Sequence, residues 1–397
     1  MLLIDQKANL LVSKIDFAEK RIKEIYSPDS ILKTYIESVT DRIGTLKYQI
    51  GLAKSEFEEF VKETSFADKD HLRTAPQRGL LRDILRSYEE IEQSFYLGID
   101  AFLPLISVWI HQSHDENTKR EHNLLVAFVK ELLKLSGISE DLMTILGETY
   151  ACLPLYWGNV ARHIAFATYT ETENLRRWVL LAHEIGHVFY DLHFEEFNSN
   201  VIPQVIGKLS ERKPLNMAPR ELESVIYVWA EKWIPELASD CFAVKTLGPP
   251  YAVQFMLAVL DSKPDHVDVS HPPNNMRVYF TMDLLDSLAI PDFNVDSYRG
   301  IWNSYSLSVT RPSSQYILDE EIVEAALNGI DRIVSGTPIK GKWNEILSAS
   351  QALSCGSLPS EDLLSVISAM ALLDPTIRLD EIYPWLLERY ALDPDAS

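Results

Sequence analysis

Two histidines and a glutamate lie within five residues of each other, in the sequence H-E-I-G-H at positions 183–187. The surrounding run from Trp178 to Tyr190 is mostly apolar and predicts a buried helix. Residues four apart on a helix lie about 40° apart around its axis, so His183 and His187 can reach one metal ion. Glu184 projects to the same side and could take a proton from a water on that ion. This H-E-x-x-H pattern is typical of zinc hydrolases.

A catalytic zinc site has a third protein ligand and an open fourth position. We expect Glu236 as this ligand, because it shares a helix face with Asp240 in the otherwise apolar stretch 233–244. A carboxylate can bind zinc, and a second carboxylate one turn later can accept the other N–H of a ligating histidine. The simpler alternative is that Glu236 and Asp240 form a solvated acidic face.

His193 is the other candidate for the third ligand, because His183, His187 and His193 have the spacing found in metzincins. In that family a glycine breaks the helix so that the third histidine can turn back. The corresponding residue here is Tyr190, which resists a positive φ angle. On an unbroken helix, His193 points about 120° away from His187. We therefore expect His193 to be a solvated residue near the end of the helix.

A third motif, H-P-P at 271–273, is followed by Arg277 six residues after His271. The order H-E-x-x-H, E-x-x-x-D and H-P-P with a later arginine resembles the gluzincin peptidases of the CAAX-prenyl-endopeptidase and HtpX type. The H-E-I-G-H helix also resembles the ImmA/IrrE repressor-cleaving metallopeptidases. The resemblance covers residues 160–280, about a third of the chain.

The resemblance implies a zincin-like core that binds one Zn2+ ion through His183, His187 and Glu236, with Glu184 as the general base. Asp240 would be the hydrogen-bond partner of a ligating histidine. The chain differs from the membrane proteases of this group because no transmembrane helix is expected, so a prenylated or membrane-protein substrate is in doubt.

His271 and Arg277 would line the site, where they would polarise a substrate carbonyl or steady the acidic residues. Zinc lowers the pKa of a water that it binds from about 15.7 to about 7. Glu184 would take that proton during attack on the carbonyl carbon and deliver it to the leaving amine. The predicted function is therefore that of a zinc metalloprotease, a hydrolase of protein or peptide substrates.

Large helical flanks favour an endopeptidase with a restricted set of substrates. One alternative is an aminopeptidase, which needs acidic residues to hold a free amine, and Glu171, Glu173 and Glu195 are candidates. The other is a non-catalytic zinc protein with a structural, binding or regulatory role. Glu184 argues against that alternative, because a structural zinc site needs no base.

The composition of the chain is that of a globular protein, with 46% hydrophobic and 24% charged residues among 397. The net charge of −21 disfavours binding to nucleic acids and to anionic membranes, which both require basic surfaces. Three widely spaced cysteines indicate a reducing compartment. The start of the chain lacks the form of a signal peptide, and the apolar stretch 95–110 is short for a membrane span. These features predict a cytoplasmic protein.

The hydrophobic periodicity predicts a mainly α protein with a small β-sheet, an α+β fold, in three regions. Residues 1–148 form a helical region, 149–290 the zincin-like core and 291–397 a second helical region, and the flanks could bind a protein partner.

Within the core region we expect strands at 155–157 and 164–169, the second with a free edge that could bind a peptide. Prolines predict a loop at 198–219 that could act as a lid. A long helical stretch should follow from about residue 220, be kinked or restart at Pro235, and end near Gly248. Four more helices are expected near 319–334, 342–353, 360–371 and 378–391.

Overall fold

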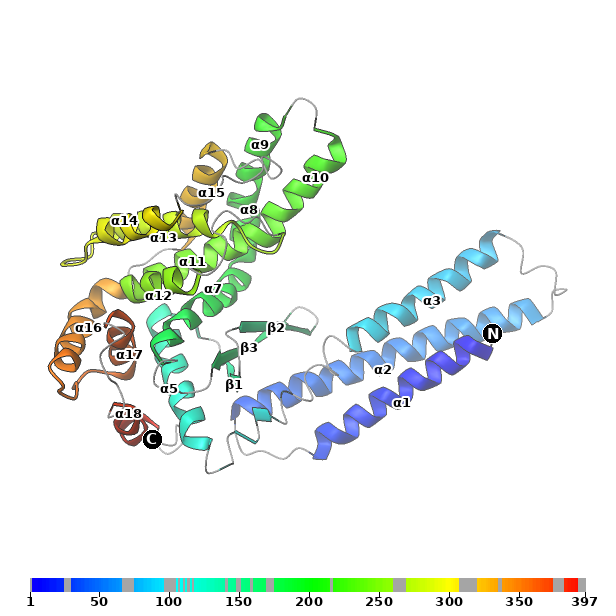
Figure 1. The fold of residues 1–397 in the computed structure, drawn as a ribbon. Helices are drawn as coiled ribbons and strands as arrows, with labels where there is room; N and C mark the ends of the chain where they lie inside the picture. Colours follow the sequence, from blue (N-terminus) through cyan, green and yellow to red (C-terminus); the bar gives the residue numbers. More distant parts are fainter. Residues whose placement is uncertain are drawn as a thin grey trace. The chain divides into compact units, whose positions relative to one another are not determined.

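The fold is mainly helical, as predicted (Figure 1). The computed structural model describes residues 2–24, 30–65, 75–95, 105, 108–109, 111–112, 115, 118–139, 142–147, 151–157, 160–168, 175–214, 217–259, 269–306, 320–334, 338–373 and 382–391. Most of the apolar stretch 95–110 lies outside these residues. Among the helices that are described, none is both long and apolar enough to cross a membrane.

The first helices of the described chain are Leu2–Glu24 (α1), Ser30–Ser65 (α2), Ala75–Phe95 (α3) and Lys119–Ser136 (α5). Three strands and a 3-10 turn come next: Met143–Gly147 (β1), Ala151–Trp157 (β2), Val160–Thr168 (β3) and Arg176–Leu180 (η3). The elements around the candidate site are Leu181–Leu192 (α7), Phe194–Asn200 (α8), Ile202–Arg212 (α9), Pro219–Val228 (α10), the π-helical turn Trp229–Trp233 (η4), Ile234–Leu247 (α11), Pro249–Val259 (α12) and Asn274–Leu288 (α13). The last helices are Val295–Ser306 (α14), Glu320–Ile333 (α15), Pro338–Ser354 (α16), Leu363–Leu372 (α17) and Ile382–Tyr390 (α18).

The chain forms two compact units. The first comprises Met1–His114, Asp141–Ile145 and Leu153–Ile164, and the second comprises the rest of the chain. The division into regions 1–148, 149–290 and 291–397 stays a prediction.

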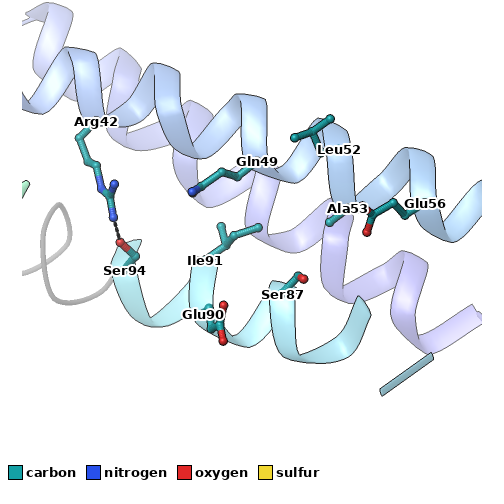
Figure 2. Close-up of a pocket in the computed structure, with 9 residues that line it drawn as sticks. All are labelled: Arg42, Gln49, Leu52, Ala53, Glu56, Ser87, Glu90, Ile91 and Ser94. Carbon is teal, nitrogen blue, oxygen red and sulfur yellow. Dashed lines mark hydrogen bonds between the residues drawn. The ribbon is translucent and has the colours of Figure 1, made fainter. Parts of the chain in front are cut away.

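In the first unit, α1 and α3 both pack along α2. Buried residues recur at three- and four-residue steps on α2, as the periodicity predicted, and include Ile43, Leu46 and Ile50. A groove of about 390 Å³ lies between α2 and α3. Figure 2 shows the residues that line it, among them Arg42, which donates a hydrogen bond to Ser94.

The three strands pair in the order β1-β3-β2. The strand that precedes α7 in the chain is β3, and it lies between the other two. Both of its edges are therefore paired, and the expectation that this strand offers a free edge to a peptide is wrong.

The predicted loop at 198–219 is also wrong, because most of it is helical. It contains the end of α8 and all of α9. Pro203 lies in the first turn of α9, where a missing backbone N–H breaks no helical hydrogen bond. Val205 and Leu209 are four residues apart and both buried, so this helix is held by its apolar face.

Helix α11 is the central helix of the second unit and is buried along nearly its whole length. It contacts α7, α12, α13, α15 and α16 (Figure 1). The kink or restart predicted at Pro235 corresponds to the π-helical turn η4, which joins α10 to α11, and Pro235 lies in the first turn of α11. The helix ends at Gly248, whose φ angle is +60°, and the four helices expected after residue 319 correspond to α15–α18.

Candidate metal centre

Two helices, α7 and α11, cross unusually closely at Gly186. A Cβ atom at this position would lie 2.6 Å from Cα of Ser239, far inside van der Waals contact. Gly186 is the fourth residue of the H-E-I-G-H sequence, and Ser239 lies between Glu236 and Asp240. The small residues therefore bring the face of α7 that carries the histidines against the face of α11 that carries the carboxylates.

The structure brings His183, His187 and Glu236 together. One candidate ligand atom from each residue lies within 4.8 Å of the other two. His183 Nε2 is 3.3 Å from Glu236 Oε2, and His187 Nε2 is 3.4 Å from Glu236 Oε1. In a tetrahedral zinc site with bonds of about 2.0–2.2 Å, neighbouring ligand atoms lie about 3.3–3.6 Å apart. The spacing therefore suits a metal ion bound by two nitrogens and a carboxylate.

The carboxylate of Glu236 has a buried oxygen, Oε2, that makes no hydrogen bond within the described part of the chain. Nearly all buried polar atoms in native proteins have such a partner. Two nitrogens do lie nearby, His183 Nε2 and Arg277 Nη2, each 3.3 Å away, but neither has hydrogen-bond geometry. A cation coordinated by Oε2 would remove this deficit, so the residues present fit a metal ion.

Asp240 holds His183 from the opposite side of the imidazole ring. Its Oδ1 lies 2.9 Å from His183 Nδ1, and its side chain is completely buried. This contact leaves His183 Nε2 for the proposed ion, as the sequence predicted for an outer carboxylate. Burial opposes a charged imidazole, but the charges of Asp240 and Glu236 outweigh it and raise the pKa of His183 to about 10.

Arg277 on α13 binds both acidic residues of α11. Its Nε and Nη2 atoms donate to the two oxygens of Asp240 at 2.7 and 2.8 Å, a bidentate ion pair. Burial would raise the pKa of both carboxyls, but the guanidinium outweighs it. The pKa of Asp240 is lowered to about 2, and that of Glu236 falls well below its ordinary value. Arg277 therefore keeps both carboxylates ionised and steadies them, one of the two roles that the resemblance implied.

Tyr251 is part of the same network, although sequence reasoning did not select it. This residue of α12 is fully buried and its hydroxyl donates to Asp240 Oδ1 at 2.6 Å. Burial, together with the negative charge of Asp240, raises the pKa of Tyr251 well above its ordinary value, so the hydroxyl remains a donor. No motif contains this tyrosine, and only the packing of α12 against α11 and α13 brings it to the site.

His271 lies at the exposed rim of the centre. Its Nε2 is 3.8 Å from Glu236 Oε1, its side chain is 52% exposed, and its Nδ1 is 2.8 Å from the hydroxyl of Ser270. Exposure increases across the site, from 0% for the side chain of Asp240 to 12% for His183 and 26% for His187. The centre is therefore closed on the Asp240 side and reaches solvent on the side of His187 and His271.

Glu184 follows His183 directly on α7 and is half-buried. Within the described part of the chain, no hydrogen bond or ion pair of its carboxylate is found, in contrast to Asp240. Its helical position places it on the side of α7 that carries the two histidines. Its role as a base stays a prediction.

The other residues that the sequence offered, as a third metal ligand or to hold a free amine, are not found at the centre among the described residues. His193 ends α7, stacks on Phe189 and directs its Nδ1 to the carbonyl oxygen of Phe189 at 2.9 Å, so it is not part of the metal cluster. Glu171 and Glu173 lie outside the described residues. Glu195 is an exposed residue of α8.

Comparison of the chain with models of known protein families, with curated proteins and with solved structures finds no match. The resemblance to gluzincin peptidases therefore stays a prediction, and the function is inferred below from the geometry of the site.

Proposed function

We propose that this protein is a zinc-dependent peptidase with a gluzincin-like catalytic core. The observation that carries the proposal is the convergence of His183, His187 and Glu236 at ligand spacing, with a buried oxygen of Glu236 that lacks a hydrogen bond. Two imidazoles and one carboxylate are the ligand set of well-studied zinc peptidases. Manganese or cobalt could bind the same donors, but zinc suits this set best.

His183, His187 and Glu236 would hold a zinc ion, which would supply Lewis acidity to a water and to a peptide carbonyl. Glu184, next to a ligand and without a partner of its own among the described residues, takes the proton of the attacking water. The same carboxylate then delivers that proton to the leaving amine. Asp240 and Arg277 keep His183 and Glu236 in place throughout, so little reorganisation is needed during the reaction.

The gradient of exposure favours a catalytic site over a structural one. A structural zinc has four protein ligands and is closed to solvent. Among the described residues three candidate ligands converge, and the side with His187 and His271 is open. His271 lies where its imidazole could donate a hydrogen bond to the oxygen of a bound carbonyl. The proposal extends to a protein or peptide substrate in the cytoplasm, and to a restricted choice of substrate imposed by the helical flanks.

The test combines metal analysis with a peptidase assay on the purified full-length chain. We expect about one zinc per chain and hydrolysis that stops on treatment with a chelator and returns with zinc. The Glu184→Gln variant should keep its zinc and lose at least about 100-fold in turnover, the usual contribution of a general base. The matched control is Glu196→Gln, on the exposed first turn of α8, which should retain full activity.

Full activity of Glu184→Gln would refute the assignment of the base. A zinc-loaded wild-type protein that cleaves neither unfolded proteins nor peptide libraries would refute the proposed reaction. Comparison of free and N-acetylated peptides decides between endopeptidase and aminopeptidase, because only an aminopeptidase requires the free amine.

A further inference from the structure

The carboxylate of Asp240 is held by side chains from three different helices. His183 on α7 and Arg277 on α13 contact it, and the hydroxyl of Tyr251 on α12 makes the shortest of these contacts, at 2.6 Å. Helix α12 contributes no candidate metal ligand. Its contribution to the centre is therefore made through Asp240.

The hydroxyl of Tyr251 binds the same oxygen of Asp240, Oδ1, that contacts the candidate ligand His183. Both Tyr251 Oη and His183 Nδ1 contact Oδ1 of Asp240, at 2.6 and 2.9 Å, and the two atoms are 3.5 Å apart. Arg277 also contacts Oδ1, but its Nη2 atom lies near Glu236 Oε2 as well. Arg277 Nη2 lies 3.5 Å from His183 Nδ1 too, so it serves both carboxylates and the histidine, whereas the contacts found for the Tyr251 hydroxyl among the described residues are with Asp240 and His183.

The tyrosine itself has little freedom to move. It is fully buried, and its ring stacks on that of Phe255 one turn later on α12, with centroids 5.7 Å apart. The guanidinium of Arg277 lies 4.8 Å from the centre of the Phe255 ring. Tyr251 and Phe255 therefore form an aromatic pair that also packs against Arg277, another partner of Asp240.

We propose that Tyr251 is a positioning residue of the metal centre, which acts through Asp240 to orient His183 and thereby increases the affinity for the ion. The inference rests on the metal site of the proposed function, but it does not require that the protein be a peptidase. Partners in the outer shell of a metal site typically contribute 10- to 100-fold in affinity. Since Arg277 stays in place, we expect the lower end of this range, about 10-fold.

The test is the affinity of the full-length chain for cobalt, measured by competition with a chelator, for the wild type and Tyr251→Phe. Phenylalanine keeps the stacked ring and removes only the hydroxyl, so the variant should fold and its circular dichroism should match that of the wild type. We expect about 10-fold weaker binding and an altered visible absorption spectrum of the bound cobalt, which reports directly on ligand orientation.

The matched control is Tyr383→Phe on α18, because this tyrosine also donates its hydroxyl to a carboxylate, that of Glu121 on α5, but belongs to a different cluster. It should bind cobalt as the wild type does. A second test places Tyr251→Phe in an Asp240→Asn background, where the loss of the hydroxyl should cost much less than 10-fold if it acts through Asp240.

Each outcome separates the two proposals. Equal cobalt affinity and identical spectra for the wild type and Tyr251→Phe overturn the positioning role. An undiminished 10-fold loss in the Asp240→Asn background overturns the route through Asp240. Tight cobalt binding without any peptide hydrolysis overturns the proposed function alone, and a wild type that binds no cobalt overturns both.

Discussion

Replacing Gly186 by alanine is expected to force apart the two helices that carry the candidate ligands. The added Cβ would lie 2.6 Å from Cα of Ser239 and 2.9 Å from its carbonyl oxygen. Carbon atoms in good contact are about 3.5–4.0 Å apart, so α7 and α11 must separate by roughly 1 Å. The neighbouring atoms belong largely to the backbone, so no rotamer change can relieve the contact.

A separation of this size matters more to a metal site than to the rest of the core. Metal–ligand distances tolerate deviations of only about 0.2 Å. His183 and His187 move with α7, while Glu236 moves with α11, so a shift of roughly 1 Å breaks the spacing of 3.3–3.4 Å between them. We expect zinc affinity to fall more than the roughly 10- to 100-fold that follows loss of an outer partner.

The stability of the protein should change in a more limited way. Overpacking of a core typically costs about 1–3 kcal/mol, whereas alanine is favoured over glycine inside a helix by about 1 kcal/mol. The variant Gly207→Ala is the matched control: Gly207 lies within α9, and a Cβ there would meet no atom within 4 Å. Since the propensity gain is common to both variants, their difference in free energy of unfolding isolates the contact with Ser239, about 1–3 kcal/mol.

The assay is zinc affinity by chelator competition, paired with urea unfolding of the metal-free proteins. Gly207→Ala should bind zinc normally and be as stable as the wild type or slightly more so. If Gly186→Ala binds zinc as tightly as the wild type, the close crossing of α7 and α11 does not set the ligand spacing.

Two further predictions concern the rim of the centre and a helix start in the same unit. His271→Ala should lower turnover but keep the zinc, because His271 is half exposed and its Nε2 is 3.8 Å from Glu236 Oε1. If metal analysis shows that this variant loses its zinc, His271 is instead a fourth ligand of a closed site. Asp362→Ala should destabilise the protein by about 0.5–2 kcal/mol in urea unfolding at pH 7, since Asp362 caps α17 by accepting a hydrogen bond from Ser365 N–H at 2.8 Å. Burial raises the pKa of Asp362, but Lys342 and Ser365 outweigh it and hold this pKa below its ordinary value of 3.8. The part of the stabilisation that depends on the ionised carboxylate is therefore complete above about pH 4 and decreases as the pH falls further. An undiminished effect of Asp362→Ala at pH 3 would contradict this.

The positions of the candidate ligands could be predicted because helical spacing alone determines which side chains share a face. His183 and His187 are four residues apart, as are Glu236 and Asp240, and the structure places the two pairs opposite each other on α7 and α11. Their mutual distance could not be predicted in the same way. It depends on Gly186 and Ser239, whose importance becomes visible only when the two helices are seen to cross.

The prolines between α7 and α11 favoured a prediction that the structure contradicts. They suggested a loop at 198–219, but Pro203 and Pro219 both lie in the first turn of a helix, as does Pro235. Proline is tolerated there because the first backbone N–H groups of a helix have no partner within it. The buried positions of α9 recur at helical spacing, and this signal was stronger than the breaker signal of a single proline.

The order of the strands and the place of Tyr251 in the site could not be predicted from the sequence, for a different reason. Both depend on contacts between segments distant in sequence, and no local pattern encodes them. Strand β3 is the last of the three strands in the chain, but in the sheet it lies between β1 and β2. Tyr251 is a single aromatic residue in an apolar helix, so periodicity identifies it only as a core residue.

The charged network in the middle of the second unit is difficult to explain by stability alone. Replacing a buried ion pair by well-packed apolar residues is often neutral or stabilising. Here Glu236, Asp240 and Arg277 are all buried between helices whose other buried residues are mostly apolar. The two carboxylates are balanced by the guanidinium and by the imidazole of His183, whose pKa is raised to about 10, but one carboxylate oxygen makes no hydrogen bond within the described chain. A cation bound between His183, His187 and Glu236 would take the place of a proton on His183 and satisfy that oxygen, so metal binding explains the network better than folding stability does.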